Sequence, residues 1–312
     1  MPLKHILEVN GRKVQVSNLE KVLYPEAGFT KGQVIDFYVQ IAAVILPHLK
    51  DRPVTLKRYP NGIAAKYFYE KNKPRSTPPW VATFPVPRRA GGPDIRYILI
   101  NDLPTLVWCA NLANLEIHPF LHRAPDIDQP TAMVFDLDPG DNADILDCGR
   151  VAFLLKDLLA PWKLELFPKV SGSRGIQVYM PLNTKVTYHV VRPLAKSIAE
   201  HLEREHPGLV VAEMAKISRA GKVFIDWSQN SDFKTTVCVY SLRARRPSPF
   251  VSMPVTWEEL HRALSNQDRS SLDFPPGAAL ERIAKRGDLF APVLELRQRL
   301  PAALLRRFRP ET

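Results

Sequence analysis

Cysteine is scarce in this sequence, with three thiols in 312 residues, at Cys109, Cys148 and Cys238. No two of them form a Cys-x-x-Cys pair, so neither a zinc ribbon nor a disulfide framework is indicated. Long apolar runs are also missing, and neither a secretory leader nor a membrane-spanning stretch is found. We therefore expect a soluble cytoplasmic protein with buried thiols and no membrane partner.

Acidic residues are outnumbered by basic ones. The chain has 43 Lys and Arg against 32 Asp and Glu, which gives a formal net charge of +11. Such an excess is typical of proteins that bind a polyanion such as nucleic acid or a membrane surface, and the alternative is a basic soluble protein without such a partner. A phosphate loop of the GxxxxGK[ST] type is absent, which argues against a P-loop nucleotidase.

Apolar periodicity and turn signals predict an α+β (mixed α/β) chain without internal repeats or flexible linkers. ILEVNGRKVQV alternates like a hairpin that turns at Asn10-Gly11, and Thr30 is placed to cap a helix over residues 31–46. The other strands expected lie within residues 53–71, 115–118, 133–138, 167–182, 222–228 and 235–242. The other helices expected lie over residues 104–114, 143–159 and 187–205 and over much of the chain from 256 onward.

The segment MVFDLDPG, residues 133–140, carries two carboxylates out of an apolar strand. Side chains two apart on a strand face the same side, so Asp136 and Asp138 point together. Two repelling carboxylates at the edge of a core are costly unless a cation lies between them. Asp226 in VFIDWSQN repeats the pattern, and three strand-borne acids suit a two-metal phosphoryl-transfer site. The alternative for Asp138 is a turn aspartate before Pro139-Gly140.

Three further stretches carry polar groups that suit nucleotide or DNA binding. The turn SGSRG, residues 171–175, combines hydroxyls, flexible amides and the guanidinium of Arg174, which can cradle phosphates, although a plain hairpin turn has the same sequence. His118 ends the predicted strand ahead of the acids and is either catalytic or structural. Cations alternate with rings in TLKRYPNG and YFYEK, which is typical of binding to broken or single-stranded nucleic acid and also of a half-buried strand.

The order of NLEKVLYP, TLKRYPNG, YFYEK, LEIH, VFDLDPG, VSGSRG, RAGKVFIDWSQN and YSLRAR resembles the polymerase domain of bacterial DNA ligase D, in the archaeo-eukaryotic primase superfamily. The resemblance runs from about residue 15 to residue 290. It implies a primase-polymerase fold, with mainly antiparallel central sheets flanked by helices and with acids on the catalytic strands. It also implies a polymerase of non-homologous end joining that acts on DNA ends, uses a divalent metal, usually Mn²⁺, and prefers ribonucleotides.

Carried over residue by residue, the resemblance implies three groups of site residues. Catalysis and the binding of two Mn²⁺ or Mg²⁺ ions would fall to Asp136, Asp138 and Asp226. Nucleotide binding would fall to Lys57, His118, Ser171, Arg174, Gln229 and Arg243. DNA binding would fall to Lys21 and Lys31 at the 5′-phosphate of a downstream strand, to the stacking rings Phe68 and Tyr69, and to Arg219.

The chain departs from the family pattern in the serine turn. The family usually reads GLH where this chain has Gly175-Ile176-Gln177, and Arg174 stands where a lysine is usual. Gln177 can donate a hydrogen bond but cannot carry charge or exchange protons near neutral pH. Weaker or altered nucleotide binding is therefore an alternative, while the three retained acids argue against an inactive protein. The KxDG motif of nucleotidyl-transferring ligases is absent, so the chain is a stand-alone polymerase or one domain of a larger ligase.

We expect a single catalytic domain over residues 1–312, with a DNA-end-contacting part over about 1–114, a catalytic sheet over about 115–250 and a helical segment over about 256–312. The expected function is template-dependent nucleotidyl transfer, which fills gaps and extends ends at double-strand breaks. Its substrates would be DNA with a 5′-phosphate and NTPs or dNTPs. Ku and a DNA ligase are candidate partners of a monomer associated with the nucleoid. The alternatives are a non-catalytic end-binding or synapsis module, which Gln177 supports, and another DxD metal-dependent transferase, which leaves Asp226 and the positive charge unexplained.

Overall fold

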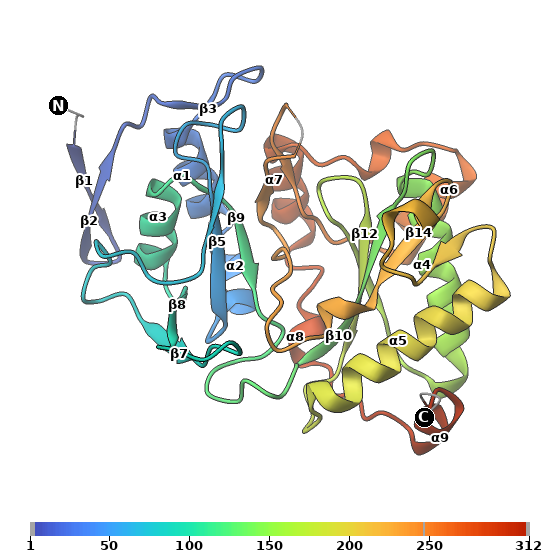
Figure 1. Ribbon diagram of the computed structural model, residues 1–312. Coiled ribbons are helices and arrows are strands. Elements are labelled where there is room, and N and C mark those ends of the chain that lie inside the picture. Colours follow the sequence, from blue (N-terminus) through green and yellow to red (C-terminus); the bar gives the residue numbers. More distant parts are fainter. Residues whose placement is uncertain (1–3, 246, 310–312) are drawn as a thin grey trace. The chain divides into compact units, whose positions relative to one another are not determined.

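The computed structural model describes residues 4–245 and 247–309 of the chain (Figure 1). The chain forms two compact units, each assembled from three segments. Unit 1 contains Met1–Ala124, Thr235–Ser252 and Phe274–Asp288, and unit 2 contains Pro125–Lys234, Met253–Asp273 and Leu289–Thr312. The architecture is mixed α/β with several antiparallel sheets and flanking helices, which confirms the expected fold class.

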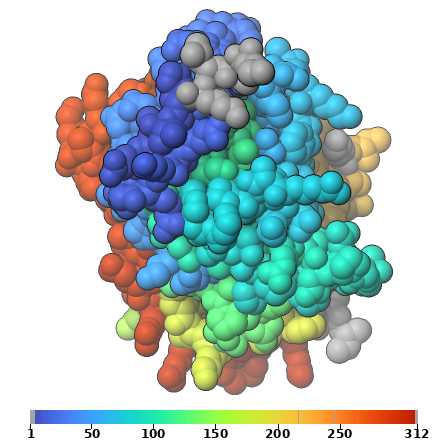
Figure 2. Space-filling view, turned by 90° about the vertical axis from the view of Figure 1, so that its left-hand side faces the viewer, coloured from blue at the N-terminus to red at the C-terminus, as the bar shows by residue number. Residues whose placement is uncertain are grey.

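Unit 1 is built on an antiparallel sheet around the buried strand β5 (Pro53–Arg58). This strand pairs with β9 (Asn114–Pro119), β6 (Phe68–Glu70) and β8 (Ile95–Leu99), and β7 (Thr83–Val86) pairs with β8. The remaining elements of unit 1 are β1 (Lys4–Val9), β2 (Arg12–Ser17), β3 (Val22–Tyr24), β4 (Phe29–Thr30), α1 (Lys31–Gln40), α2 (Ala42–Leu49), α3 (Leu103–Asn111), β15 (Leu242–Arg243), β16 (Phe250–Val251) and α7 (Pro276–Arg286). The dark-blue hairpin and the light-blue to cyan segments that include β6 and β7 lie at the surface of this unit (Figure 2).

The N-terminal hairpin forms as its sequence predicts. Strands β1 and β2 pair in antiparallel register, and the turn residues Asn10 and Gly11 both have a positive φ, of 48° and 73°. Positive φ at both central positions matches the right-handed twist of the two strands. Thr30 caps α1 in a capping box with Gln33, as its place before the apolar periodicity indicates.

The single helix expected over residues 31–46 is wrong, because the segment forms two helices. Helix α1 ends at Gln40, α2 begins at Ala42, and the two axes are bent by 80°. The sequence of α2, AAVILPHL, is apolar almost throughout, so its periodicity does not fix the direction of the axis. Among the described residues no single helix is long and apolar enough to cross a membrane, and only this bent pair reaches that length and composition.

Unit 2 is built on a five-stranded sheet in the order β11-β12-β10-β14-β13, in which only the β13–β14 pair is parallel. Helices α4 and α5 pack on this sheet, and α6 packs on α4 (Figure 1). The strands are β10 (Ala132–Pro139), β11 (Phe167–Val170), β12 (Ile176–Pro181), β13 (Val210–Val211) and β14 (Val223–Asp226). The helices are α4 (Ile145–Leu159), α5 (Tyr188–Glu205), α6 (Trp257–Ser265), α8 (Pro292–Glu295) and α9 (Ala302–Arg307), with short 3-10 turns η1 (Ala160–Trp162), η2 (Lys216–Arg219), η3 (Trp227–Gln229) and η4 (Ser270–Leu272).

The strand expected over residues 235–242 is not formed as a continuous ladder. The N–H groups of Thr236 and Cys238 donate to carbonyls of β9, at 3.1 and 2.9 Å, so the segment begins to run beside that strand. Tyr240 then adopts a φ of 66°, which turns the backbone out of the extended region. Only Leu242–Arg243 resumes a strand, as β15.

Candidate active site

Three predicted acids share one face of the unit 2 sheet. Asp136 of β10 lies directly opposite Asp226 of β14 in the register, and Asp138 lies two residues further along β10, opposite Phe224. Opposite residues in a ladder and residues two apart on a strand point to the same face. Asp136 and Asp226 are half-buried and Asp138 is exposed, so β10 leaves the core at this point.

The same face continues as a row of polar side chains across two more strands. Gln177 of β12 is the register partner of Asp136, and Lys169 of β11 is the partner of Gln177. Both are buried, with 3% and 0% of their surface exposed. Burial raises the pKa of Asp136 to about 8, and the charges of Asp138 and Asp226 act in the same direction. A hydrogen bond from Gln177 and the charge of Lys169 act in the opposite direction.

Asp226 is engaged by residues that follow it in the chain. Its Oδ1 accepts hydrogen bonds from the hydroxyl and from the backbone N–H of Ser228, the latter at 3.0 Å. Its Oδ2 accepts a hydrogen bond from Gln229 Nε2 at 3.0 Å and lies 3.7 Å from Lys234 Nζ. Lys234 Nζ also donates to the Ser228 hydroxyl. The turn η3, which ends the strand at Asp226, brings these donors onto both carboxylate oxygens.

The donor set fits a hard divalent cation in its chemistry. The three carboxylates offer only oxygen ligands, which Mn²⁺ and Mg²⁺ prefer. A bound cation would also offset the burial and the carboxylate repulsion that raise the pKa of Asp136. Gln229 Oε1, beside Asp226, is buried and has no hydrogen-bond partner in the part of the chain that the structure describes. Within that same part, no three His, Cys, Asp or Glu side chains converge tightly enough to enclose an ion. The carboxylates are therefore of the right type but are not pre-assembled around an ion.

The SGSRG turn joins β11 to β12 and is tightly fixed. Ser171 Oγ accepts hydrogen bonds from the N–H groups of Ser173 and Gly175, each at 3.3 Å. A Cβ on Gly175 would lie 2.1 Å from the carbonyl oxygen of Leu137 in β10, so no side chain fits there. Two of the loop amides are thus directed at Ser171, and Arg174 is exposed. The serine organises the turn, while the arginine is available to a ligand.

Arg219 lies on the acid-bearing face. Its guanidinium stacks on the ring of Phe224, with the central carbon 3.7 Å from the ring centre, and Nη2 donates to the Met214 carbonyl at 2.7 Å. Phe224 is the register partner of Asp138, so its ring and the carboxylate share a face. The structure therefore places Arg219 beside the acids, although its role in DNA binding stays a prediction.

In unit 1 three predicted nucleotide-binding residues converge on Glu116, which the sequence analysis did not single out. Glu116 of β9 is fully buried. Its carboxylate lies 3.0 Å from Lys57 Nζ, 3.0 Å from His118 Nε2 and 3.2 Å from Arg243 Nε. The Tyr59 hydroxyl donates to the same carboxylate at 3.3 Å. Sequence positions 57, 118 and 243 are thereby gathered around one buried anion.

The charge states in this cluster follow from burial and from the mutual contacts. Burial alone would raise the pKa of Glu116, but the charges of Arg243, His118 and Lys57 hold it well below its ordinary range. Burial lowers the pKa of His118 and of Lys57, and in both cases contact with Glu116 opposes the shift. Lysine has three donors and arginine five, so Lys57 and Arg243 can contact Glu116 and still donate to a second anion.

Aromatic residues of β6 and the preceding Tyr67 pack against one side of the same cluster. Lys57 Nζ lies 4.4 Å from the ring centre of Tyr67 and 5.7 Å from that of Tyr69. Phe68 instead contacts Arg58, whose guanidinium lies 5.1 Å from its ring centre. Phe68 and Tyr69 are 42% and 54% exposed and, as neighbours on a strand, face opposite sides. Of these two residues, Tyr69 shares the face of Lys57 and is its register partner.

Lys21 and Lys31 are brought together by the β3–β4 pair. The Lys31 N–H donates to the Lys21 carbonyl at 2.8 Å, and Lys21 Nζ donates to Asn61 Oδ1 at 3.0 Å. Lys31 is only 5% exposed. Burial lowers its pKa to about 8, and the charges of Lys21 and Arg58 act in the same direction. Clustered cations of this kind attract an anion such as a phosphate.

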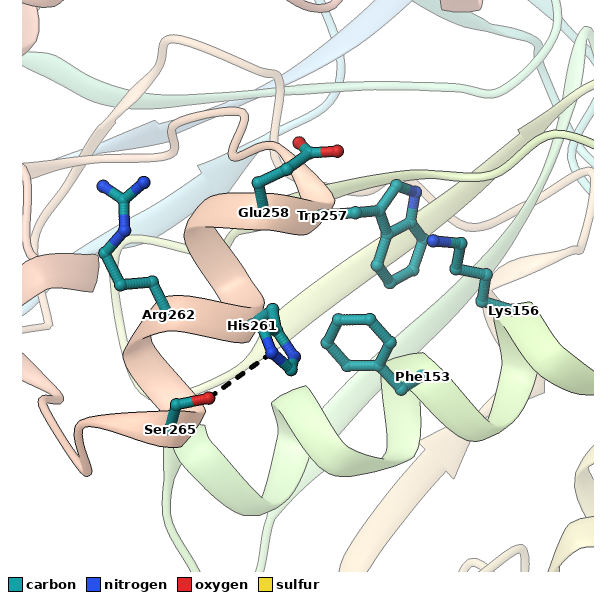
Figure 3. Close-up of a pocket in the computed structure, with 7 residues that line it drawn as sticks. All are labelled: Phe153, Lys156, Trp257, Glu258, His261, Arg262 and Ser265. Atoms are coloured by element: carbon teal, nitrogen blue, oxygen red, sulfur yellow. Dashed lines mark hydrogen bonds between the residues drawn. The ribbon is translucent and has the colours of Figure 1, made fainter.

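An open pocket of about 510 Å³ lies between α4 and α6 of unit 2 (Figure 3). Lys156 Nζ lies 4.8 Å from the ring centre of Trp257, and the Phe153 ring centre lies 5.2 Å from the same indole. The lining residues are Phe153, Lys156, Trp257, Glu258, His261, Arg262 and Ser265. None of the predicted site residues lines this pocket, so the chemistry predicted from the acids lies elsewhere.

Three residues of these clusters escaped the sequence analysis, for different reasons. Glu116 is two residues from His118 in LEIH, so the spacing that revealed the aspartate pair also indicates it. Lys169 lies on β11 two residues before Ser171 of the turn and carries a similar signal. Lys234 has no such signal, because it reaches Asp226 only through the η3 turn.

Comparison with known proteins identifies the family of the chain. The family model of the LigD primase-polymerase domain matches residues 30–290. The chain is 40% identical over 283 residues to the multifunctional non-homologous end joining protein LigD of Mycolicibacterium smegmatis, covering 90% of this chain and 36% of that protein. It is 32% identical over 277 residues to the bifunctional non-homologous end joining protein LigD of Bacillus subtilis, covering 88% of this chain and 43% of that protein. The chain thus spans less than half the length of these relatives.

A solved structure has the same fold. The polymerase domain of Mycobacterium tuberculosis ligase D, in complex with DNA, superposes with a TM-score of 0.83 at 40% identity, covering 91% of this chain and 99% of that domain. The family model covers most of the chain, and the three acids that carried the resemblance lie on one face of the sheet. The chain therefore belongs to the LigD primase-polymerase domain family.

Proposed function

We propose that the chain is a template-dependent nucleotidyltransferase that fills gaps and extends DNA ends during non-homologous end joining, with a preference for ribonucleotides. The observation that carries the proposal is the register of β10 and β14, which sets Asp136 opposite Asp226 with Asp138 on the same face. Membership of the LigD primase-polymerase family supports it, and so does the likeness to a polymerase domain in complex with DNA. Both units together would form the single catalytic domain over residues 1–312.

The acids would hold two divalent cations, Mn²⁺ or Mg²⁺, which lower the pKa of an attacking 3′-hydroxyl and stabilise a leaving pyrophosphate. Gln177 would orient Asp136 through their hydrogen bond. Arg174 and the Ser171 turn would bind phosphate oxygens, with Gln229 near Asp226.

In unit 1, Lys57 and Arg243 would donate to the triphosphate from the positions that Glu116 fixes. His118 Nε2 faces the Glu116 carboxylate, so only its other ring nitrogen can contact a nucleotide. Lys21 and Lys31 would bind the 5′-phosphate of a downstream strand, and Arg219, Phe68 and Tyr69 would contact DNA.

The partners of the whole protein are part of the same proposal. The curated relatives that the chain matches are named as multifunctional or bifunctional end-joining proteins, and the chain spans less than half of each. We propose that the domain works with a DNA ligase activity and with Ku at broken ends, as a nucleoid-associated monomer.

The proposed function is tested by primer extension on a gapped duplex with a downstream 5′-phosphate. Each NTP and dNTP is supplied with Mn²⁺ or Mg²⁺, and Asp136→Ala is the matched control. We expect templated addition by the wild type only, stimulated by the 5′-phosphate and faster with NTPs. Addition by Asp136→Ala at the wild-type rate would exclude the acid row as the catalytic centre.

The second candidate is a non-catalytic module that binds and holds DNA ends. The neutral Gln177, which is the register partner of Asp136, favours it. In the same assay this candidate predicts tight binding to the gapped duplex without addition of any nucleotide.

A further inference from the structure

One of the three acids faces a cationic side chain. The Nζ ammonium of Lys234 lies 3.7 Å from Asp226 Oδ2. This contact is partly shielded from solvent, since the side chains of Lys234 and Asp226 are 31% and 13% exposed. Its attraction is therefore screened less than that of a surface ion pair.

Three residues contact the Asp226 carboxylate, namely Ser228, Gln229 and Lys234. We call these three residues the Asp226 latch. Ser228 donates twice to Oδ1, and Gln229 donates to Oδ2 at 3.0 Å. Lys234 donates to the Ser228 hydroxyl as well as lying beside Oδ2, so its ammonium is held from two sides. The latch fixes the carboxylate in one orientation.

A divalent cation at Asp226 would meet this ammonium at close range. Like charges within a few ångströms repel, by an amount that depends on the local dielectric. The hydrogen bonds from Ser228 and Gln229 are neutral and can persist beside a metal, because each carboxylate oxygen has two lone pairs. Lys234 is therefore the member of the latch that competes with a cation.

We propose that Lys234 is a positioning residue that holds Asp226 in the metal-free protein and must release it when a divalent cation binds. This inference rests on the proposed function, because it takes the acid row to be the metal site. Lys234 thereby determines what concentration of divalent cation is needed to fill the site. The lysine itself is not a metal ligand and does not touch the reacting atoms.

The test is the affinity for Mn²⁺ alone, without nucleotide or DNA, followed by the electron paramagnetic resonance signal of free Mn²⁺. The variants are Lys234→Met, which removes the charge, and Lys234→Arg, which keeps it. Lys185→Met is the control, because this exposed lysine of unit 2 undergoes the same change in net charge. We expect Lys234→Met to bind Mn²⁺ tighter by roughly 3- to 10-fold at low salt. Lys234→Arg and Lys185→Met should stay within about twofold of the wild type.

A second readout separates competition from mere support of the fold. Without metal, Lys234→Met should melt at a lower temperature than the wild type, since the Asp226 charge loses its partner. Saturating Mn²⁺ should then raise its melting temperature by more than it raises that of the wild type. Mn²⁺ affinity of Lys234→Met equal to or weaker than wild type would overturn the inference. Equal Mn²⁺ binding by wild type and Asp136→Ala would instead overturn the metal site, and with it the proposed function.

Discussion

At the scale of single residues, Glu116 shows how one buried anion arranges two cationic side chains and a histidine. Replacing it with glutamine leaves Lys57 and Arg243 close together without a counter-charge in a buried site. We expect Glu116→Gln to lower the free energy of unfolding by about 3 kcal/mol at pH 7, as measured by urea denaturation. Glu70→Gln, which breaks the less buried ion pair with Arg58, is the control and should cost below about 1 kcal/mol.

The pH dependence of this effect has a definite sign. The pKa of Glu116 is lower in the folded protein than in the unfolded chain, so its stabilisation is present above its ordinary pKa near 4.5. It is lost as the pH falls further, through the folded-state pKa. The difference between wild type and Glu116→Gln should therefore shrink in strongly acidic solution. A constant difference would show that the carboxylate charge is not what stabilises the cluster.

Asp136 contributes a pH dependence of stability with the opposite sign. Its pKa of about 8 in the fold lies above the value of the unfolded chain, so the metal-free protein loses stability as the pH rises from about 4 to about 8. Asparagine cannot ionise, and Asp136→Asn should therefore be more stable than wild type, by a margin that grows by up to about 1.4 kcal/mol per pH unit. Urea denaturation at pH 5 and pH 8 in the presence of a chelator measures this margin. If Asp136→Asn were less stable than wild type at pH 8, the raised pKa of Asp136 would be contradicted.

Lys31 gives a third prediction, on ligand binding. Its pKa of about 8 means that the free ammonium loses its proton above that pH. The preference for 5′-phosphorylated over 5′-hydroxyl DNA should then fade between pH 8 and roughly pH 10. Binding of the two DNAs is compared by fluorescence anisotropy. Lys31→Arg keeps its charge over this range and should retain its preference at high pH. A wild-type preference that is unchanged at high pH would exclude Lys31 as the titrating group.

Single site residues could be predicted from the sequence where two polar side chains stand two residues apart on a strand. Asp136 and Asp138 follow from this spacing directly, and the structure adds that Asp226 is the register partner of Asp136. Strand register is a long-range property, so no local pattern could assign that pairing. Lys234 was missed for a different reason, because its contact with Asp226 depends on the η3 turn that follows the strand.

At the scale of secondary-structure elements, the turns beside the sheet matter as much as the strands. Gly175 directly precedes β12, where a Cβ would lie 2.1 Å from the Leu137 carbonyl oxygen. Gly175→Ala should separate the start of β12 from β10 and cost about 2 to 4 kcal/mol in urea denaturation. Gly208→Ala is the control in the same unit, because nothing lies within 4 Å of the position that a Cβ would take there, and it should be nearly neutral. Equal effects of both substitutions would argue against the close approach.

The elements also show where sequence patterns lose information. The hairpin at Asn10-Gly11 and the capped start of α1 have strong local signals, and both formed as expected. The bend at Ile41 and the positive φ of Tyr240 have no local sequence signal, because neither residue type favours those conformations. Tertiary packing decides there, since Ile41 and Tyr240 are both fully buried.

At the scale of the whole molecule, the proposed function and the net charge of +11 together predict salt-sensitive binding to DNA. Binding should weaken steeply with salt, since each phosphate contact releases counterions and adds about 0.9 to the slope of log K against log salt concentration. Lys21→Ala should reduce this slope by about 1 on 5′-phosphorylated DNA and leave it unchanged on 5′-hydroxyl DNA. Anisotropy titrations between low and moderate salt measure both slopes. An equal reduction on both DNAs would mean that Lys21 contacts the backbone elsewhere.

The division of the chain into two units of three segments has a consequence for its synthesis. The chain passes from one unit to the other after residues 124, 234, 252, 273 and 288. The buried Tyr38 hydroxyl donates to the carbonyl of Leu115 and also contacts Ser241, and the Tyr24 hydroxyl donates to the Arg243 carbonyl, so unit 1 is held together across more than 200 residues of sequence. Folding during translation cannot then proceed from the N-terminus one unit at a time. Unit 1 can complete its core only after the segment Phe274–Asp288 has been synthesised, and unit 2 only after the segment that begins at Leu289.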